Sequence, residues 1–273
     1  MPELPEIETI RRGLSPLLTG RRIESVTVRE RRLREPIAPR ELARLRGARV
    51  TGLRRRSKYL LLDTSAGLTL LVHLGMTGQL FVSDGGRPRR PHEHVVLGLD
   101  DGRELRFADT RRFGLLRVLR SDRVDRDPRI EGLGPEPLGG GLTAGDLFRL
   151  TRGRSKPVKN FLIDTRAIAG IGNIYACEAL HRSRINPRRR VRQIGPDGWE
   201  RLLASLREVL NEAIEAGGTT LRDFLNAEGD AGYFALSLKV YDREGKPCVR
   251  CGSVIRRIVQ AGRSSFYCPR CQR

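Results

Sequence analysis

Cys248-Val-Arg-Cys251 and Cys268-Pro-Arg-Cys271 are the two short stretches that decide the fold at the C-terminal end of this chain. Each stretch places a pair of thiols in a C-x-x-C spacing, and sixteen residues separate the two pairs. Four thiolates at such a spacing can converge on the tetrahedral site that structural zinc occupies. We therefore predict one structural zinc, held by Cys248, Cys251, Cys268 and Cys271.

The residues between the two cysteine pairs predict a β-hairpin. Residues 254–259 and 265–267 favour strands, and they flank a Gly-containing turn at 260–263. Arg263 lies in that turn, so the zinc would hold its guanidinium outward on a rigid arm, where a phosphate contact is the simplest role. The fifth cysteine, Cys177, falls on a helical face and is expected to be a buried core thiol.

The composition of the 273-residue chain points to a polyanionic partner. Its formal net charge is +20, and all but five of its 52 basic residues are arginines. A balance this basic favours nucleic acid as the partner. No apolar run approaches the roughly 18 residues of a membrane span, and no signal-peptide pattern opens the chain, so we expect a cytoplasmic protein that does not bind membranes.

The region before the cysteines is predicted to be helical. Thr143-Ala-Gly-Asp146 matches a capping box that opens a helix, and further helices are expected over 156–165, 173–183 and 197–216. The last of these carries one apolar stripe, made of Leu202, Leu203, Leu206, Val209, Leu210 and Ile214. Gly170-Ile-Gly172-Asn173 leads into a helix N-terminus, which alone is a weak signal for phosphate binding.

The N-terminal half is predicted to be one helix followed by an antiparallel β-sandwich. Apolar residues at helical spacing cover 5–18, and Gly20 ends the pattern. Short strands then follow with turn signals and no helices between them, at 23–28, 50–63, 68–73, 94–99, 104–108 and 115–119. The predicted fold class is therefore α+β.

A stretch rich in Pro, Gly and charge, 121–141, separates the two halves. The predicted organisation is an N-terminal domain over 1–121, a linker over 122–142, a helical domain over 143–236 and a zinc finger over 237–273.

The first residues, Met1-Pro-Glu-Leu-Pro-Glu-Ile-Glu8, hold the candidate chemistry. If Met1 is removed, Pro2 becomes a free secondary amine, whose pKa of about 8 leaves a useful fraction neutral and nucleophilic at pH 7. Attack by this amine on a sugar C1′ would give an iminium ion, which acidifies the neighbouring C2′–H and opens an elimination path. Glu3 would be the proton shuttle beside it. A proline at position 2 is usually only the start of a chain, so this hypothesis depends on the residues that accompany it.

Three further groups of residues lie at strand ends or in turns of the N-terminal half. Arg54-Arg-Arg-Ser-Lys58 indicates a phosphate-binding face and contains one of the few lysines. Met76 lies in a Gly-rich turn, where methionine is normally a core filler. Arg111 and Phe113 share the turn 109–114, where Phe113 could act as a wedge in a base stack. Taken singly, each group has an ordinary structural explanation.

Together these motifs resemble the formamidopyrimidine-DNA glycosylases, a family that excises oxidised purines from DNA. The resemblance rests on PELPEIET at the N-terminus, R-R-x-K-Y-L around Lys58, Leu-Gly-Pro-Glu-Pro-Leu at 133–138, the turn before Asn173 and the four cysteines. It covers essentially the whole chain, with the motifs in the family's order. It implies a helix–two-turns–helix element in the helical domain, DNA bound between the two halves, and no catalytic metal or nucleotide cofactor.

The resemblance also implies a role for each candidate residue. Pro2, Glu3, Lys58 and Arg263 would be catalytic, with Arg263 assisting the last elimination step. Three side chains would fill the space left by an everted base, with the arginine facing the estranged cytosine: Met76, Arg111 and Phe113. The remaining DNA-binding candidates are His92, Arg154, Lys159 and Asn173. Residues 217–234 resemble the loop that closes over the everted base.

The reaction implied is excision of 8-oxoguanine and formamidopyrimidines, followed by strand cleavage through β- and δ-elimination. The partner would be double-stranded DNA containing an oxidised base, and the protein would be a monomer associated with the bacterial nucleoid. Two alternatives stay open, an endonuclease VIII-like glycosylase for oxidised pyrimidines and a non-catalytic zinc DNA-binding protein. Leu4 within PELPE, together with Met76, Arg111 and Phe113, favours the first family over endonuclease VIII.

Overall fold

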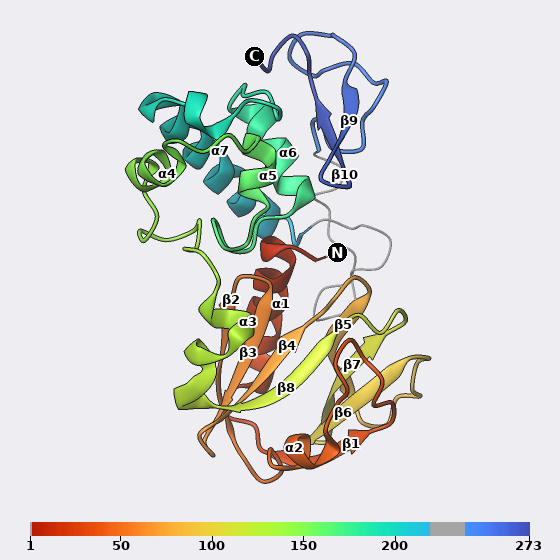
Figure 1. The fold of residues 1–273 in the computed structure, drawn as a ribbon. Helices are drawn as coiled ribbons and strands as arrows, with labels where there is room; N and C mark the ends of the chain where they lie inside the picture. Colours follow the sequence, from red (N-terminus) through yellow and green to blue (C-terminus); the bar gives the residue numbers. More distant parts are fainter. Residues whose placement is uncertain (1, 219–237) are drawn as a thin grey trace. The chain divides into compact units, whose positions relative to one another are not determined.

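The computed structural model describes residues 2–218 and 238–273, which belong to two units (Figure 1). The first unit contains residues 2–131 with 216–218, and the second contains residues 132–215 and 238–273. Within these described residues, none of the helices combines the length and the apolar character that a membrane span needs. Met1 and most of the predicted closing loop at 217–234 lie outside the described residues.

The first unit is the predicted antiparallel β-sandwich. One sheet has the strand order β1-β6-β7-β5, with bounds Ile23–Val28 (β1), Glu93–Leu99 (β6), Arg103–Asp109 (β7) and Gly78–Asp84 (β5). The other has the order β2-β3-β4-β8, with bounds Val50–Arg56 (β2), Tyr59–Thr64 (β3), Leu68–His73 (β4) and Leu115–Arg120 (β8). Leu62, Leu70, Leu97 and Phe107 are each no more than 2% exposed, so an apolar core holds the two sheets together.

Helix α1, Leu4–Leu18, lies against the sandwich (Figure 1). One apolar stripe of the helix is part of the sandwich core. Its stripe of Ile7, Ile10, Leu14 and Leu18 is almost fully buried, as the sequence pattern predicts. The backbone N–H of Glu3 donates to Glu6 Oε2 at 2.7 Å where the helix begins. This bond fixes the chain direction at the N-terminus of α1.

The structure differs from the sequence prediction around Lys58. The sequence predicts one strand over 50–63, but β2 and β3 pair antiparallel as a hairpin, with Ser57 and Lys58 as its turn. Ser57 has φ +56°, in the left-handed region that Gly or Asn usually fill in such turns, so the sequence carries no signal for it. Lys58 therefore lies in a turn and not inside a strand.

Residues 121–131 are folded as part of the first unit, although their composition resembles a linker. Ser121–Arg126 form the 3-10 helix η1 and Pro128–Glu131 form helix α3, with Val124 and Ile130 buried. Helix α2, Pro39–Ala43, and strand β5 are also absent from the sequence prediction. The domain limits derived from the sequence remain a prediction.

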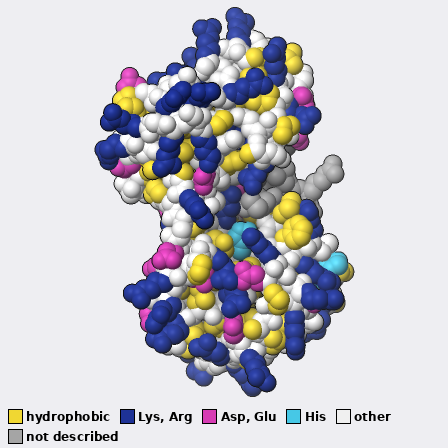
Figure 2. All heavy atoms as spheres, viewed as in Figure 1, with side chains coloured by type: hydrophobic (Ala, Val, Ile, Leu, Met, Phe, Trp, Pro, Cys, Tyr) yellow, Lys and Arg dark blue, Asp and Glu magenta, His cyan; other side chains and the backbone are white. Residues whose placement is uncertain are grey.

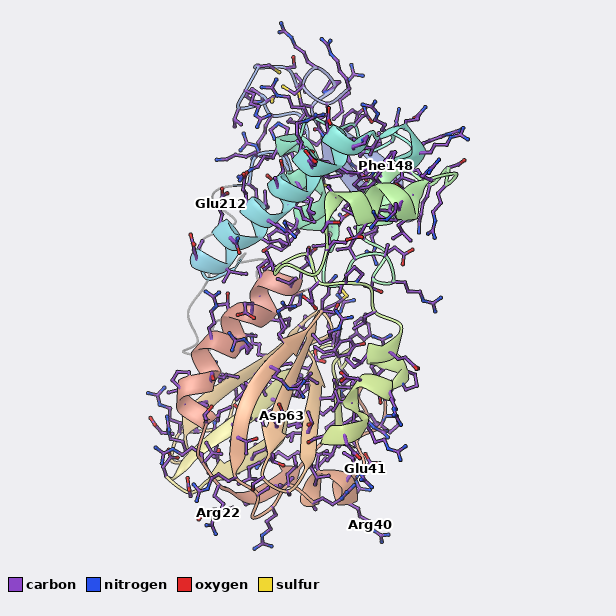
Figure 3. The ribbon with its side chains drawn as sticks, turned by 90° about the vertical axis from the view of Figure 1, so that its left-hand side faces the viewer. Arg22, Arg40, Glu41, Asp63, Phe148 and Glu212 are labelled. Atoms are coloured by element: carbon purple, nitrogen blue, oxygen red, sulfur yellow. The ribbon has the colours of Figure 1, made fainter. Side chains whose placement is uncertain are left out.

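The second unit contains the predicted helices, with bounds Ala144–Thr151 (α4), Val158–Leu162 (α5), Asn173–Arg182 (α6) and Pro196–Glu215 (α7), and the 3-10 helix η2 at Val191–Gln193. The capping box is present, because the Asp146 N–H donates to Thr143 Oγ1 at 3.1 Å and the Thr143 N–H to Asp146 Oδ2 at 2.9 Å. The apolar stripe of α7 is buried, and Trp199 packs edge to face on Phe161 of α5. On its outer side, Glu212 of α7 (Figure 3) pairs with Arg182 at the end of α6 at 2.6 Å.

The zinc-finger segment forms the predicted hairpin. Strands β9, Arg256–Gln260, and β10, Arg263–Tyr267, pair antiparallel, with Ala261 and Gly262 at the tip. Both tip residues have positive φ, +47° and +71°, which matches a tight two-residue turn. Arg263 therefore lies directly after the tip.

Candidate active site and metal centre

Pro2 and Glu3 are buried where α1 begins. Helix α1 and strand β2 run antiparallel. The Gly20 N–H just after the helix donates to the Val50 carbonyl at the start of β2 (2.9 Å), and Glu8 in the first half of the helix contacts Arg55 near the end of the strand. The helix spans about 22 Å and the strand a similar length. The start of α1 and the end of β2 therefore lie at the same end of the first unit.

At that end, the Arg55 side chain bonds both to helix α1 and to the β2–β3 turn. Its Nε contacts Glu8 Oε2 at 3.3 Å, and its Nη1 donates to the Ser57 carbonyl at 3.0 Å. One guanidinium thus links the first turns of α1 to the turn that carries Lys58, which is only 6% exposed. The structure brings Lys58 to the end of the unit that also holds Pro2 and Glu3.

Two members of the arginine run before Lys58 pair with carboxylates in the structure. Arg54 Nε contacts Asp63 Oδ2 at 2.6 Å across the β2–β3 pair, with Asp63 labelled in Figure 3. Arg55 is paired with Glu8 as described. A carboxylate of the same unit thus pairs with each guanidinium, and phosphate binding by this run stays a prediction.

His73, at the end of β4, lies close to Lys58. Its ring packs against Tyr59 with 5.0 Å between centroids, and its Nδ1 accepts the Gly75 N–H at 3.0 Å. Burial, together with the positive charges of Arg34 and Lys58, lowers the pKa of His73 to about 4. The imidazole is therefore neutral near pH 7 and serves as an acceptor for the turn that carries Met76.

Met76 and Phe113 are large apolar side chains exposed on adjacent turns. Their exposed fractions are 40% and 44%. The Arg111 guanidinium lies over the Phe113 ring, 4.7 Å from its centroid. Among residues 2–218 and 238–273, no carboxylate forms an ion pair with Arg111. The structure thus brings the three predicted void-filling residues together and leaves their side chains open to a partner.

His92 is exposed in the loop between β5 and β6, with a positive φ of 66°. Its carbonyl accepts the Asp109 N–H at 3.0 Å. The His94 ring packs edge-on at 6.3 Å, and His94 Nε2 donates to the Asp109 carbonyl at 2.7 Å. The loop end that carries His92 is therefore anchored to the end of β7, next to the turn of Arg111.

In the second unit, Lys159 and Asn173 converge on the hairpin. Asn173 Nδ2 donates to the Ser264 carbonyl at 2.8 Å, and Lys159 Nζ donates to the same carbonyl at 3.4 Å. Lys159 is fully buried. Both side chains therefore hold β10 directly beside Arg263, which is exposed.

Arg154 lies a few residues before Lys159 in the sequence but differs from it in exposure. It is exposed, and its backbone N–H donates to the Thr151 carbonyl at 3.1 Å after helix α4. Nearby, Lys156 Nζ contacts Asp164 Oδ2 at 2.6 Å, so that lysine is neutralised. Arg154 is thus the more available cation of the two.

Basic side chains are spread widely over each unit. On the visible face of both units, Lys and Arg outnumber Asp and Glu (Figure 2). This distribution agrees with the net charge of +20 and favours a polyanion as the partner.

The four cysteines converge on one site, with their sulfur atoms all within 4.8 Å of one another. Cys248 Sγ and Cys271 Sγ are 3.9 Å apart, and Cys251 Sγ and Cys268 Sγ are 3.5 Å apart. Ligands at the usual Zn–S distance of about 2.3 Å are separated by about 3.8 Å in a tetrahedron, far more than the roughly 2.05 Å of a disulfide. The donor set fits one structural zinc, as predicted.

Helix α6 contacts the finger at three points along its length. At its start, Asn173 bonds the Ser264 carbonyl. In the middle, buried Glu178 accepts three backbone N–H bonds at 2.8–3.0 Å, from Lys239, Val240 and Tyr241. Near its end, His181 Nε2 lies 3.4 Å from Cys248 Sγ. Burial raises the pKa of Glu178, against the opposing effect of the three N–H donors.

Sequence reasoning does not identify Glu178 or His181 as functional residues. Their partners lie 62 and 67 residues away in the chain, and no local motif links them. The one available signal is a carboxylate and an imidazole within a helix that is otherwise apolar on its buried face. Such residues need a buried partner.

Three protein-family models together match most of the chain. Residues 1–116 match the formamidopyrimidine-DNA glycosylase N-terminal domain, 133–225 match the formamidopyrimidine-DNA glycosylase H2TH domain, and 245–273 match the zinc finger found in FPG and IleRS. A formamidopyrimidine-DNA glycosylase of Stenotrophomonas maltophilia is 48% identical over 273 residues, covering 100% of both chains.

Two of the solved structures that share the whole fold are DNA complexes. One is a complex between a mutant Lactococcus lactis FPG and DNA containing Fapy-dG, 31% identical with a TM-score of 0.92. The other is MutM in complex with DNA containing carbocyclic 8-oxo-G, 32% identical with a TM-score of 0.91. Each comparison covers 100% of both chains. Sandwich, helices, zinc site and relatives agree, and the chain belongs to the formamidopyrimidine-DNA glycosylase family of DNA repair enzymes.

Proposed function

We propose that this enzyme excises oxidised purines, 8-oxoguanine and formamidopyrimidines, from double-stranded DNA and then cleaves the strand at the abasic site. The observation that carries the proposal is the burial of Pro2 and Glu3 at the end of the sandwich that presents Lys58. The relatives solved with Fapy-dG and carbocyclic 8-oxo-G DNA support the choice of substrate.

Pro2 supplies the nucleophile once Met1 is removed. A bond forms between its nitrogen and C1′ while the glycosidic C–N bond breaks, and the leaving base takes up the proton that the amine releases, by way of Glu3. Glu3 then takes up a second proton from water and gives it to the ring oxygen, which opens the sugar and leaves an iminium ion on Pro2. A secondary amine suits this step because its iminium is cationic without a further proton.

The iminium ion withdraws electrons from C1′, which makes the C2′–H acidic. Loss of that proton breaks the C3′–O bond with the 3′ phosphate as the leaving group, and a second elimination breaks the C5′–O bond. We assign Lys58 to the DNA backbone at the reacting sugar and Arg263 to the second elimination. Water then hydrolyses the conjugated iminium and releases Pro2.

The remaining candidates bind DNA. Met76, Arg111 and Phe113 fill the space of the everted base, with Arg111 facing the estranged cytosine. The backbone contacts are assigned to His92, Arg154, Lys159 and Asn173. We further propose that the enzyme acts as a monomer and that the helical domain and the zinc finger follow the predicted limits 143–236 and 237–273.

The test is borohydride trapping on a duplex that contains 8-oxoguanine. Only an imine or iminium is reducible, so we expect a covalent protein–DNA adduct that maps to the N-terminal peptide. Retention of Met1, or Pro2→Gly, should reduce trapping while DNA binding stays nearly unchanged. Glu3→Gln should block base excision but still allow attack on an abasic site that is already present.

Lys58 is the competing nucleophile, because lysines also form Schiff bases. An adduct that maps to Lys58, or trapping that is undiminished when Met1 blocks the amine, would overturn the assignment to Pro2. A higher excision rate for oxidised pyrimidines than for 8-oxoguanine would favour the endonuclease VIII-like alternative. If none of the oxidised-base duplexes gave an adduct, the non-catalytic zinc DNA-binding protein would be the remaining alternative.

A further inference from the structure

One buried carboxylate joins the two turns that carry the void-filling residues. Asp109 is 1% exposed at the end of β7. Its Oδ1 accepts the Thr77 hydroxyl at 2.6 Å, from the turn at 74–77, and its Oδ2 accepts the Gly114 N–H at 2.7 Å, from the turn at 110–114. The two turns therefore share one acceptor group, and a shift of either turn would break a buried hydrogen bond.

The Thr77 hydroxyl makes a second link between the turns. It accepts the Arg111 N–H at 3.1 Å while it donates to Asp109, so both of its functions are used. The Arg111 N–H is also 3.3 Å from Asp109 Oδ1. The carboxylate and the hydroxyl thus orient the backbone of Arg111, while its guanidinium lies over Phe113.

The backbones of the two turns are also in direct contact. Gly75 has φ +63°, and a Cβ at this position would lie 2.4 Å from the Phe113 carbonyl carbon and 2.7 Å from the Gly114 nitrogen. No side chain fits between the turns there. Side-chain hydrogen bonds and backbone packing therefore hold Met76 and Phe113 at a fixed separation.

We propose that Asp109 and Thr77 are positioning residues that make Met76, Arg111 and Phe113 a single preformed wedge. This inference rests on the proposed function, since the wedge acts by replacing an everted base. A wedge that is ordered before binding avoids the cost of fixing three long side chains and two loops on the DNA. It also fixes the distance between the intercalating ring and the guanidinium that faces the opposite base. Thr77 and Asp109 thereby set the discrimination between opposite bases without touching DNA.

Thr77→Val tests the proposal, because valine keeps the shape of threonine and removes only the hydroxyl. We expect excision of 8-oxoguanine opposite cytosine to slow about tenfold, the typical effect of one lost buried hydrogen bond. Cleavage of a preformed abasic site should stay within about twofold of the wild-type rate. The ratio of excision rates opposite cytosine and opposite adenine should fall. Thr77→Ser keeps the hydroxyl and should restore both the rate and the ratio.

A double-mutant cycle with Phe113→Ala separates positioning from general destabilisation. If Thr77 acts through the wedge, the effects of Thr77→Val and Phe113→Ala on excision should be clearly less than additive, because both act on the same three-residue wedge. Additive effects would overturn the proposal. Asp109→Asn is the second variant, and its loss of opposite-base discrimination should exceed that of Thr77→Val, because it disturbs the bonds to both turns.

Equal losses of excision and abasic-site cleavage in Thr77→Val would overturn the proposal, as would an unchanged opposite-base ratio or a defect that Thr77→Ser shares. Fluorescence of 2-aminopurine placed next to the lesion reports base eversion without any chemistry. A wild-type protein that everts the base but forms no borohydride adduct would contradict the proposed function alone. Normal eversion by Thr77→Val would contradict the wedge alone.

Discussion

The β-sandwich and the zinc finger are stabilised in different ways. The sandwich buries a continuous aliphatic cluster that runs from Ile7 of α1 to Val118 of β8. Among the described residues, the apolar cluster of the finger buries Val240, Ile255 and Phe266 besides cysteines, with Tyr241 partly buried against it, and it adjoins α6. So small a segment cannot bury enough apolar surface to order its own chain, and metal coordination replaces the missing core.

Because of this difference, the proposed catalytic residues depend on different interactions for their position. The groups proposed for bond breaking at C1′, Pro2 and Glu3, are ordered by apolar packing of α1 on the sandwich. Arg263 is ordered by zinc and by α6. Conditions that remove the metal should therefore impair the hairpin while they leave the sandwich intact.

The largest effect that tests this comparison is expected from Cys268→Ser. Structural zinc sites bind with apparent free energies of about 10–16 kcal/mol at pH 7, so loss of one ligand should release the metal and unfold the finger. Metal analysis should show about one zinc per chain in the wild type and much less in the variant. DNA binding should fall strongly, while the thermal transition of the sandwich stays unchanged.

Cys177→Ser is the matched control, because Cys177 is as buried as Cys268 but lies outside the cluster of four sulfur atoms. It should keep the zinc. Full zinc content in Cys268→Ser, or collapse of the sandwich along with the finger, would show that the two regions are not stabilised separately.

A smaller effect is expected from pH, and in the sandwich it should come from His73. His73 has a folded-state pKa of about 4, below the usual value of 6.5, so the unfolded chain binds its proton first as the pH falls. Stability from this group is complete above about pH 6.5 and declines toward pH 4, by at most about 3 kcal/mol. His73→Asn keeps an acceptor for the Gly75 N–H and should flatten this dependence.

The measurement is the free energy of urea unfolding of the sandwich, compared between wild type and His73→Asn from pH 7 to pH 4.5. His92→Asn serves as the control, because that side chain is exposed. Parallel stability curves for wild type and His73→Asn would mean that His73 does not titrate in this window.

The smallest effect is expected from the helical part of the second unit. Thr143→Ala removes the hydroxyl that accepts the Asp146 N–H, and loss of such an N-cap costs about 1 kcal/mol. Chemical denaturation should show this loss in the transition of the second unit, with zinc content unchanged. Thr143→Ser should retain the stability, and an equal loss in that variant would assign the effect to packing of the methyl group.

The sequence predicts those features that depend on local spacing. The four cysteines, the capping box at Thr143 and Asp146 and the stripe of α7 are encoded by residues a few positions apart, so periodicity and motif spacing are sufficient. The same holds for the hairpin around Gly262. Each of these features is present in the structure.

Features that depend on distant partners are not visible in the sequence. Arg54 and Arg55 look like a free basic run, and only the fold places Asp63 and Glu8 against them. The Ser57 turn lacks the Gly or Asn that usually marks a positive φ. Asp109 and Thr77 are 32 residues apart, so their shared hydrogen bond cannot be read from either motif.

The three contacts of α6 with the finger have a thermodynamic consequence. One end of this helix meets a zinc ligand and the other meets the hairpin carbonyl beside Arg263, so one helix connects the metal site to the DNA contact that we propose for Arg263. If zinc strengthens the grip of the hairpin on DNA, DNA must strengthen the retention of zinc by the same factor. A molecule engaged on DNA is then protected from chelators that strip the metal from its free counterpart.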